Sequence, residues 1–184
     1  MIMRKYFLFL LLTLLCIAGT SSAQDKSRVI ERSVKANTTI KTKTGYNQFL
    51  VDQVKSIDSV YVKYEQLVQD VWDKKIVIDL FGTSKDPVKQ IEEAKDNVKA
   101  MPVYRGGIKY KNSVLQYADT VKRKIQYLEK FGILGADPLS DFDDYTTMSI
   151  KFEESTNEAT EARNKVRRMK DEFERNEYVK TKRR

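Results

Sequence analysis

Residues 100–113 read AMPVYRGGIKYKNS, and this stretch decides how the middle of the chain folds. It contains Pro102 and two adjacent glycines, Gly106 and Gly107. Proline cannot continue a helix, and glycine adopts backbone angles that other residues avoid. Because Ile108 then begins an apolar pattern with helical spacing, the stretch predicts a corner between two helices.

Phosphate binding and RNA binding are the functional alternatives for this stretch. A P-loop needs the pattern GxxxxGK[ST] after a strand, and a dinucleotide loop needs GxGxxG. Neither pattern occurs in MPVYRGGIKY, and a single RGG is not an RNA-binding repeat, so we expect no nucleic-acid partner. The alternative to a plain corner is a surface patch. Its candidate partner-binding residues are Tyr104, Arg105 and Tyr110.

Two helices are predicted before the corner. Apolar residues recur at spacings of three and four from Phe49 to Val71, which is typical of one helix face. The β-branched run in KKIVIDLFG weakens helix propensity, yet Ile78 and Phe81 continue the same stripe. With Gly82 as a C-terminal stop, we predict a first helix over about 46–81. An acidic cap and a proline at 86–87 then begin a shorter helix over about 86–101.

Two further helices are predicted after the corner. The third, over about 107–131, follows an apolar stripe that Gly132 ends. The fourth, over about 140–178, begins at Ser140, where Asp143 three residues on resembles a capping box. Its apolar positions repeat almost every seven residues: Tyr145, Phe152, Ala159, Val166 and Phe173, with Met148, Ser155, Ala162 and Met169 between them.

These four segments predict an all-α fold. Two long helices and two shorter ones with short connections favour an antiparallel up–down four-helix bundle, here over residues 45–178. The alternative is a more open helical hairpin that completes its core by oligomerising. We expect a monomer or a weak oligomer.

The first 23 residues predict a signal peptide. A basic pair precedes the apolar run YFLFLLLTLLCIAG, and Ser21 and Ala23 form a small–x–small site for cleavage before Gln24. A retained anchor is the alternative, but the run is short for a membrane span. Lipidation at Cys16 is a further alternative, although Leu15 replaces the small residue that a lipobox needs. Residues 24–44 are polar and predict a flexible leader, or else a short edge element packed on the domain.

The absent residue types exclude several chemistries. The chain has no histidine, and its single cysteine lies in the predicted signal peptide. Ser-His-Asp and Cys-His sites, ordinary zinc sites and the Glu-x-x-His di-iron site are therefore excluded. The acidic group DPLSDFDD at 137–144 lacks the ligand spacing of an EF-hand, and helix capping explains it more simply. We expect no catalytic residue, metal or cofactor. A carboxylate-based carbohydrate-active enzyme is the remaining enzymatic alternative.

The charge permits an acidic partner without requiring one. The net charge is +8, and removal of Arg4 and Lys5 with the signal peptide lowers it to +6. The tail at 179–184 is basic through Lys180, Lys182, Arg183 and Arg184, which we include among the candidate partner-binding residues. They would give weak contact with anionic lipid or polysaccharide, and a solvated terminus is the alternative.

The helical segments resemble a group of small exported bacterial helical proteins that includes a leptospiral-type surface protein family of no known activity. The resemblance covers residues 45–178 and rests on GYNQFLVDQ, on PVYRGGIKYKNSVLQY and on the long charged last helix. It implies an exported helical bundle and identifies no functional residue. In size, charge and helical content the chain is also similar to periplasmic holdase chaperones of the Skp type, although their strand segments are absent here.

We therefore expect a non-enzymatic protein of the bacterial envelope, in the periplasm or at the cell surface, that binds another surface or periplasmic protein or component. The alternative binding function is that of a holdase for unfolded outer-membrane proteins.

Overall fold

The computed structural model describes residues 42–175. They form four helices and no strand: α3 (Lys43–Trp72), α4 (Lys85–Ala100), α5 (Ile108–Ala136) and α6 (Phe142–Arg175). The prediction of an all-α chain with four helices is confirmed for these residues. The predicted signal peptide 1–23, the leader up to residue 41 and the tail 179–184 lie outside them.

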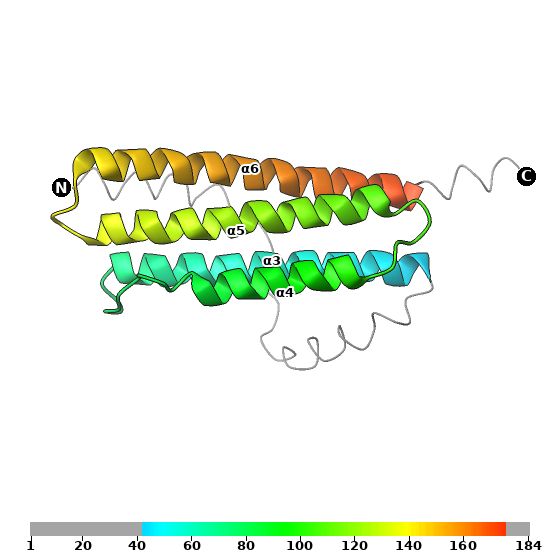
Figure 1. The fold of residues 1–184 in the computed structure, drawn as a ribbon, viewed down its shortest axis with the longest axis horizontal. Coiled ribbons are helices and arrows are strands. Elements are labelled where there is room, and N and C mark those ends of the chain that lie inside the picture. The colour runs from blue at the N-terminus through cyan, green and yellow to red at the C-terminus, as the bar shows by residue number, and fades with distance from the viewer. Residues whose placement is uncertain (1–41, 176–184) are drawn as a thin grey trace, which may run out of the picture. The chain divides into compact units, whose positions relative to one another are not determined.

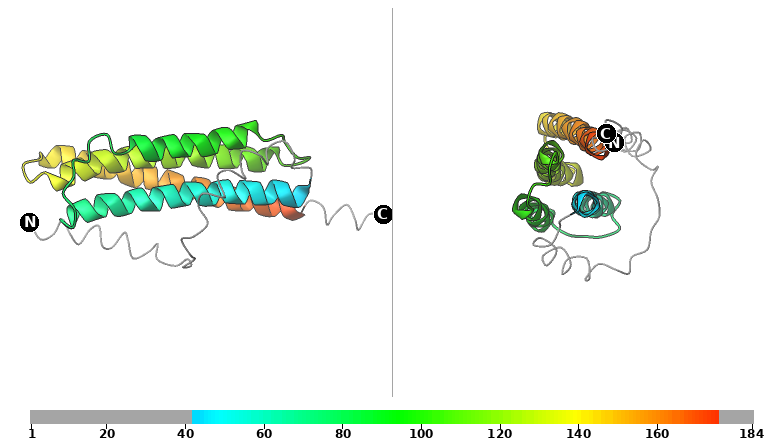
Figure 2. Two further views of the ribbon diagram at one scale, coloured as in Figure 1. Left: turned by 90° about the horizontal axis from the view of Figure 1, so that it is seen from below. Right: turned by 90° about the vertical axis from the view of Figure 1, so that its right-hand side faces the viewer.

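Helix α5 lies against each of the other three helices, and α3 also lies against α4. Helices that follow one another in the chain run in opposite directions (Figure 1). The end-on view of Figure 2 shows α5 between α6 and the pair formed by α3 and α4. Long side chains join α3 to α6: the guanidinium of Arg163 donates to Asp58 Oδ2 at 2.8 Å, and Lys43 Nζ donates to the carbonyl oxygen of Glu174 at 2.9 Å.

The apolar stripes predicted from the sequence form most of the core. Phe152, Ala159, Val166 and Phe173 of α6 are buried, as the seven-residue repeat predicts. The largest side chains that are almost fully buried come from the other helices and the residue after α4: Tyr46, Leu50, Ile57, Ile91, Met101, Tyr110 and Ile125. Ile108 does not join them, because its side chain at the first position of α5 is 48 % exposed.

The prediction that the first helix reaches Phe81 is wrong. Helix α3 begins at Lys43, where Thr42 caps it by accepting a hydrogen bond from the N–H of Gly45, and it ends at Trp72. After it, Lys74 adopts a left-handed conformation with φ of 57°. The N–H of Lys75 donates to the carbonyl oxygen of Asp70, and that of Lys74 to Val71, which is a Schellman motif. The β-branched residues that follow therefore lie outside the helix.

The prediction that Gly132 ends the third helix is also wrong, because α5 continues to Ala136. A Cβ atom at Gly132 would lie 2.9 Å from Val68 Cγ1 and 3.0 Å from Leu80 Cδ1. The glycine therefore allows close packing of α5 against α3 and the segment after it, and it does not stop the helix.

The capping residue of α6 differs from the prediction as well. Asp141 Oδ1 accepts hydrogen bonds from the N–H groups of Asp143 and Asp144, whereas the hydroxyl of Ser140 donates to the carbonyl oxygen of Leu134. The acidic group at 137–144 does cap this helix, but through Asp141 in place of Ser140.

Candidate partner-binding surface

The connection between α4 and α5 forms one end of the helical domain, which we call the joint end (residues 101–107). Gly106 has φ of 78°, and Gly107 lies directly against the ring of Tyr46, whose hydroxyl donates to the Gly107 carbonyl oxygen at 3.0 Å. The corner predicted from these glycines is therefore present. Its backbone shape depends on contact with the first turn of α3.

The patch predicted from Tyr104, Arg105 and Tyr110 does not form as a unit at this end. Arg105 is exposed and Tyr104 is half-buried, but Tyr110 is only 1 % exposed. Its ring lies 6.0 Å from that of Phe173, and burial raises the pKa of its hydroxyl above the ordinary value. Tyr110 therefore belongs to the core, because it lies on the same face of α5 as the buried Val114 and Tyr117.

The sequence around the joint end is rich in basic residues, two of which are paired with acids: Lys99 with Asp96 and Lys109 with Glu172. Residues 99–111 contain four lysines and arginines and no acidic residue, and Lys99, Arg105 and Lys109 are exposed. The fourth, Lys111, is buried, and its ammonium donates to the carbonyl oxygens of Lys99 at 2.8 Å and Met101 at 2.5 Å. It thereby caps the C-terminus of α4, where the helix dipole favours a cation. The candidate residues Lys180, Lys182, Arg183 and Arg184 lie outside the described part of the chain.

A polar network joins α3, α5 and α6 near the middle of the domain. Asp58 accepts a hydrogen bond from the hydroxyl of Tyr117 at 2.5 Å and another from Arg163 at 2.8 Å. Burial and the neighbouring carboxylate raise the pKa of the Tyr117 hydroxyl, so it remains a proton donor at neutral pH. The network links three helices through one carboxylate, which is a structural role.

Lys124 of α5 is the second unusual polar group. Its side chain is buried, and its ammonium lies 3.9 Å from the centre of the Tyr61 ring. Burial lowers the pKa of Lys124 to about 8, and the charge of Glu65 opposes part of this shift. Glu65 itself accepts a hydrogen bond from the hydroxyl of Tyr61 at 2.5 Å. A lysine of lowered pKa is suited to nucleophilic catalysis, but here the amine is covered by an aromatic ring, and we assign it to packing.

Metal binding has no candidate within residues 42–175, where no group of three or more acidic side chains is arranged to hold an ion. Among the helices of residues 42–175, none combines the length and the apolar composition that a membrane span requires.

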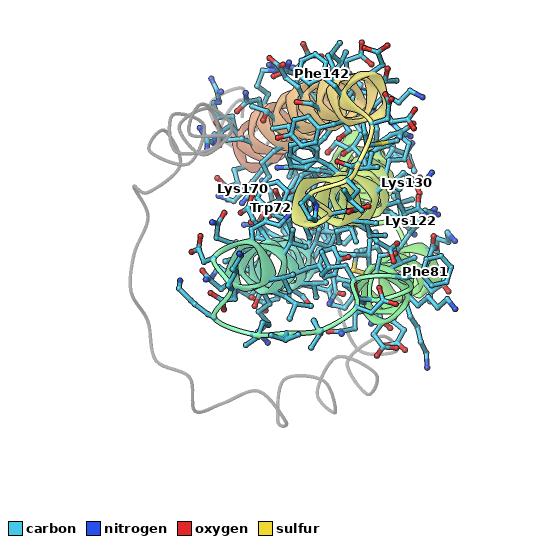
Figure 3. The ribbon with its side chains drawn as sticks, turned by 90° about the vertical axis from the view of Figure 1, so that its left-hand side faces the viewer. Trp72, Phe81, Lys122, Lys130, Phe142 and Lys170 are labelled. Atoms are coloured by element: carbon cyan, nitrogen blue, oxygen red, sulfur yellow. The ribbon has the colours of Figure 1, made fainter. Side chains whose placement is uncertain are left out.

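The opposite end of the domain carries a concentration of exposed apolar side chains. We call it the loop end and define it as residues 73–84, between α3 and α4, with residues 137–142, between α5 and the start of α6. Five of the nine large apolar side chains that are exposed among the described residues lie here: Val77 (96 %), Ile78 (43 %), Phe81 (79 %), Leu139 (91 %) and Phe142 (64 %). Figure 3 looks onto this end, with Phe142 at the start of α6 and Phe81 beside α4.

Contacts beneath these side chains hold residues 73–84 in place, and the hydroxyl of Ser140, which donates to the carbonyl oxygen of Leu134, holds the second connection to the end of α5. The indole N–H of Trp72 donates to the carbonyl oxygen of Gly132 at 2.8 Å, and the hydroxyl of Ser84 donates to Glu129 at 2.5 Å. Leu80 is only 3 % exposed and packs against Gly132. The exposed apolar groups therefore project from anchored segments.

Sequence reasoning missed this surface because it assigned Ile78 and Phe81 to the buried stripe of a helix. The signal that could have identified it is the run IVI at 76–78, whose branched side chains favour extended backbone over helix.

Comparison with known proteins gave no match. No family model fits the sequence, and no curated protein or solved structure is significantly similar to it.

Proposed function

We propose that this chain is a non-enzymatic, exported helical-bundle protein of the bacterial envelope, and that its loop end binds another surface or periplasmic component. The observation that carries the proposal is the exposure of Phe81 and Leu139 on anchored connections at one end of the domain. Apolar side chains gathered on a protein surface are typical of an interaction site.

The arrangement that we propose for the domain is the antiparallel up–down four-helix bundle. The close approach of α3 to α4, α4 to α5 and α5 to α6 supports it. Such a bundle places both connections of the loop end side by side, so that a single partner could contact both.

Export is supported by the sequence of residues 1–23, and the location in the periplasm or at the cell surface follows from it. The resemblance to exported helical surface proteins agrees with this location. The exposed Arg105 of the joint end, with Lys99 and Lys109 on either side of it, would supply the weaker contact with anionic lipid or polysaccharide.

Affinity capture from crosslinked native cells tests the proposal. The tagged protein is used as bait at low and at physiological salt, and bound proteins are quantified by mass spectrometry. One partner in near-stoichiometric yield at both salt concentrations supports a dedicated binding function, because apolar contacts are insensitive to screening. Recovery of many unrelated outer-membrane proteins would contradict it and favour a holdase.

A further inference from the structure

The first half of the loop end has the properties of an unpaired β-strand. Residues 77–80 adopt neither helix nor turn. Exposure differs between alternate positions of the segment: Val77 and Phe81 are 96 % and 79 % exposed, whereas Ile76 is half-buried, Ile78 is 43 % exposed and Leu80 is 3 % exposed. Side chains that alternate between two faces are characteristic of extended backbone.

The backbone of this segment has unused hydrogen-bonding groups. Within residues 42–175, the N–H groups of Val77, Ile78 and Asp79 donate no hydrogen bond to another residue. The N–H of Ile76 reaches the carbonyl oxygen of Asp70 only at 3.4 Å. An exposed run of β-branched residues with free N–H and C=O groups is a template for pairing with another strand.

The sequence of the segment identifies its partner, because Lys75-Ile76-Val77-Ile78-Asp79 is complementary to itself in the antiparallel direction. With Val77 opposite Val77 of a second copy, Lys75 faces the second copy's Asp79 and Ile76 faces its Ile78. Opposite charges and branched side chains are favourable cross-strand neighbours. Any other register places Lys75 away from Asp79.

We propose that residues 75–79 pair antiparallel with the same residues of a second copy about a two-fold axis at Val77. The free N–H groups of Val77 and Asp79 then donate to the carbonyl oxygens of the second copy's Val77 and Lys75, and the side chains of Ile76 and Ile78 meet at the closer, non-hydrogen-bonded positions. The contact uses the same patch on both copies and closes as a dimer. A two-stranded ribbon is only marginally stable in water, so the dimer dissociates on dilution. The formation of this dimer does not require the envelope component that we propose as the binding partner, whatever that component is.

Disulfide crosslinking tests the position of the axis. All variants carry Cys16→Ser, so an introduced cysteine is the single thiol of the chain, whether or not the first 23 residues are removed. Val77→Cys should form a disulfide dimer at least about tenfold faster than Val62→Cys, because opposed residues in an antiparallel pair have the Cα separation that a disulfide needs. Val62 is the matched control, since it is 59 % exposed in the middle of α3. Equal rates would overturn the proposal.

Charge exchange tests the register independently. Lys75→Asp and Asp79→Lys each place like charges opposite one another and should weaken the dimer about tenfold, as measured by sedimentation over a range of protein concentrations. The double exchange, Lys75→Asp with Asp79→Lys, should restore it. Thermal unfolding of each variant checks its folding, because Lys75 also contacts Asp70 and Asp73.

A wild-type chain that stays monomeric at every concentration, or a double exchange that restores nothing, would overturn the proposal. Capture of one dedicated partner in that case would leave the proposed function standing, so the two failures are distinguishable.

Discussion

The indole N–H of Trp72 donates a hydrogen bond of 2.8 Å to the carbonyl oxygen of Gly132, which joins the last residue of α3 to the final turns of α5. The indole ring also lies edge-on to Phe131, with 5.1 Å between ring centres. Beneath it, a Cβ atom at Gly135 would lie 2.7 Å from the indole. The packing of the loop end therefore depends on the close contact between the Trp72 indole and Gly135.

Gly135→Ala should destabilise the protein by about 1–2 kcal/mol, although alanine is the better helix former, because the methyl group displaces the indole and breaks its hydrogen bond. Chemical unfolding followed by circular dichroism measures the loss. The control is the same substitution in a Trp72→Phe background, where the smaller ring leaves room. An equal loss in both backgrounds would contradict the assigned contact.

Lys74→Gly should stabilise the protein by about 1 kcal/mol, because glycine adopts the left-handed conformation at the end of α3 without the strain of a side chain. The matched control is Lys89→Gly, which makes the same exchange at an exposed position inside α4 and should destabilise by about 1 kcal/mol. Denaturant midpoints of the two variants relative to wild type are the measurement. A loss of stability at Lys74 would contradict the Schellman motif.

Gly107→Ala should destabilise the joint end by about 2–3 kcal/mol, since the added Cβ would lie 2.6 Å from the ring of Tyr46. The neighbouring substitution Gly106→Ala meets no atom within 4 Å and has only the left-handed backbone conformation to oppose it, at a cost of about 1 kcal/mol. Thermal unfolding of the two variants side by side gives the order. A larger loss for Gly106→Ala would show that Tyr46 is not packed on Gly107.

Lys124→Met should stabilise the protein at pH 7 by up to about 3 kcal/mol, because burial disfavours the charged amine. The pKa of Lys124 is about 8 in the folded chain, below its ordinary value of 10.5. The unfolded chain therefore binds more protons between these two values, and wild-type stability rises with pH across that range. The penalty is fully present below pH 8 and disappears above pH 10.5.

Urea unfolding of wild type and Lys124→Met at the same pH values isolates this lysine, since the other titrations largely cancel in the difference. The stability difference should shrink steadily from pH 8 to pH 10.5. A difference that is constant with pH would show that burial does not lower the pKa of Lys124 in the folded chain.

The helices and much of the core were predictable from the sequence because their patterns are periodic. The seven-residue repeat of α6 correctly placed Phe152, Val166 and Phe173 in the core. The corner was predictable because Gly106 has φ of 78°, a conformation that few residues besides glycine tolerate, whereas Gly107 is required by its contact with Tyr46.

Elements that depend on contacts distant in sequence were not predictable in the same way. Nothing local marks Lys74 as the residue that ends α3, since a lysine replaces the usual glycine. Gly132 looks like a stop until Val68 and Leu80 are placed beside it. Lys124 lies on the apolar stripe between Val121 and Leu128, and that position was a usable signal of its burial.

The candidate surface was predictable only in part. Tyr110 and Ile108 are two residues apart, so they lie on opposite faces of the helix, and this spacing does not show which of them is buried. The prediction assigned Ile108 to the core and therefore placed Tyr110 at the surface. The loop end was missed because the sequence of residues 76–81 is compatible with both a helix and an extended segment, and the helical spacing was preferred.

The central claim is that the loop end is the binding surface. Its most direct test is to measure the dissociation constant of the captured partner for two double variants. One variant combines Phe81→Ser with Leu139→Ser. Its matched control combines Val62→Ser with Ile150→Ser, which removes two apolar side chains of 59 % and 52 % exposure from the helix surfaces. We predict that the first pair weakens binding by at least about tenfold and the control leaves it unchanged. Equal binding by both variants would contradict the claim.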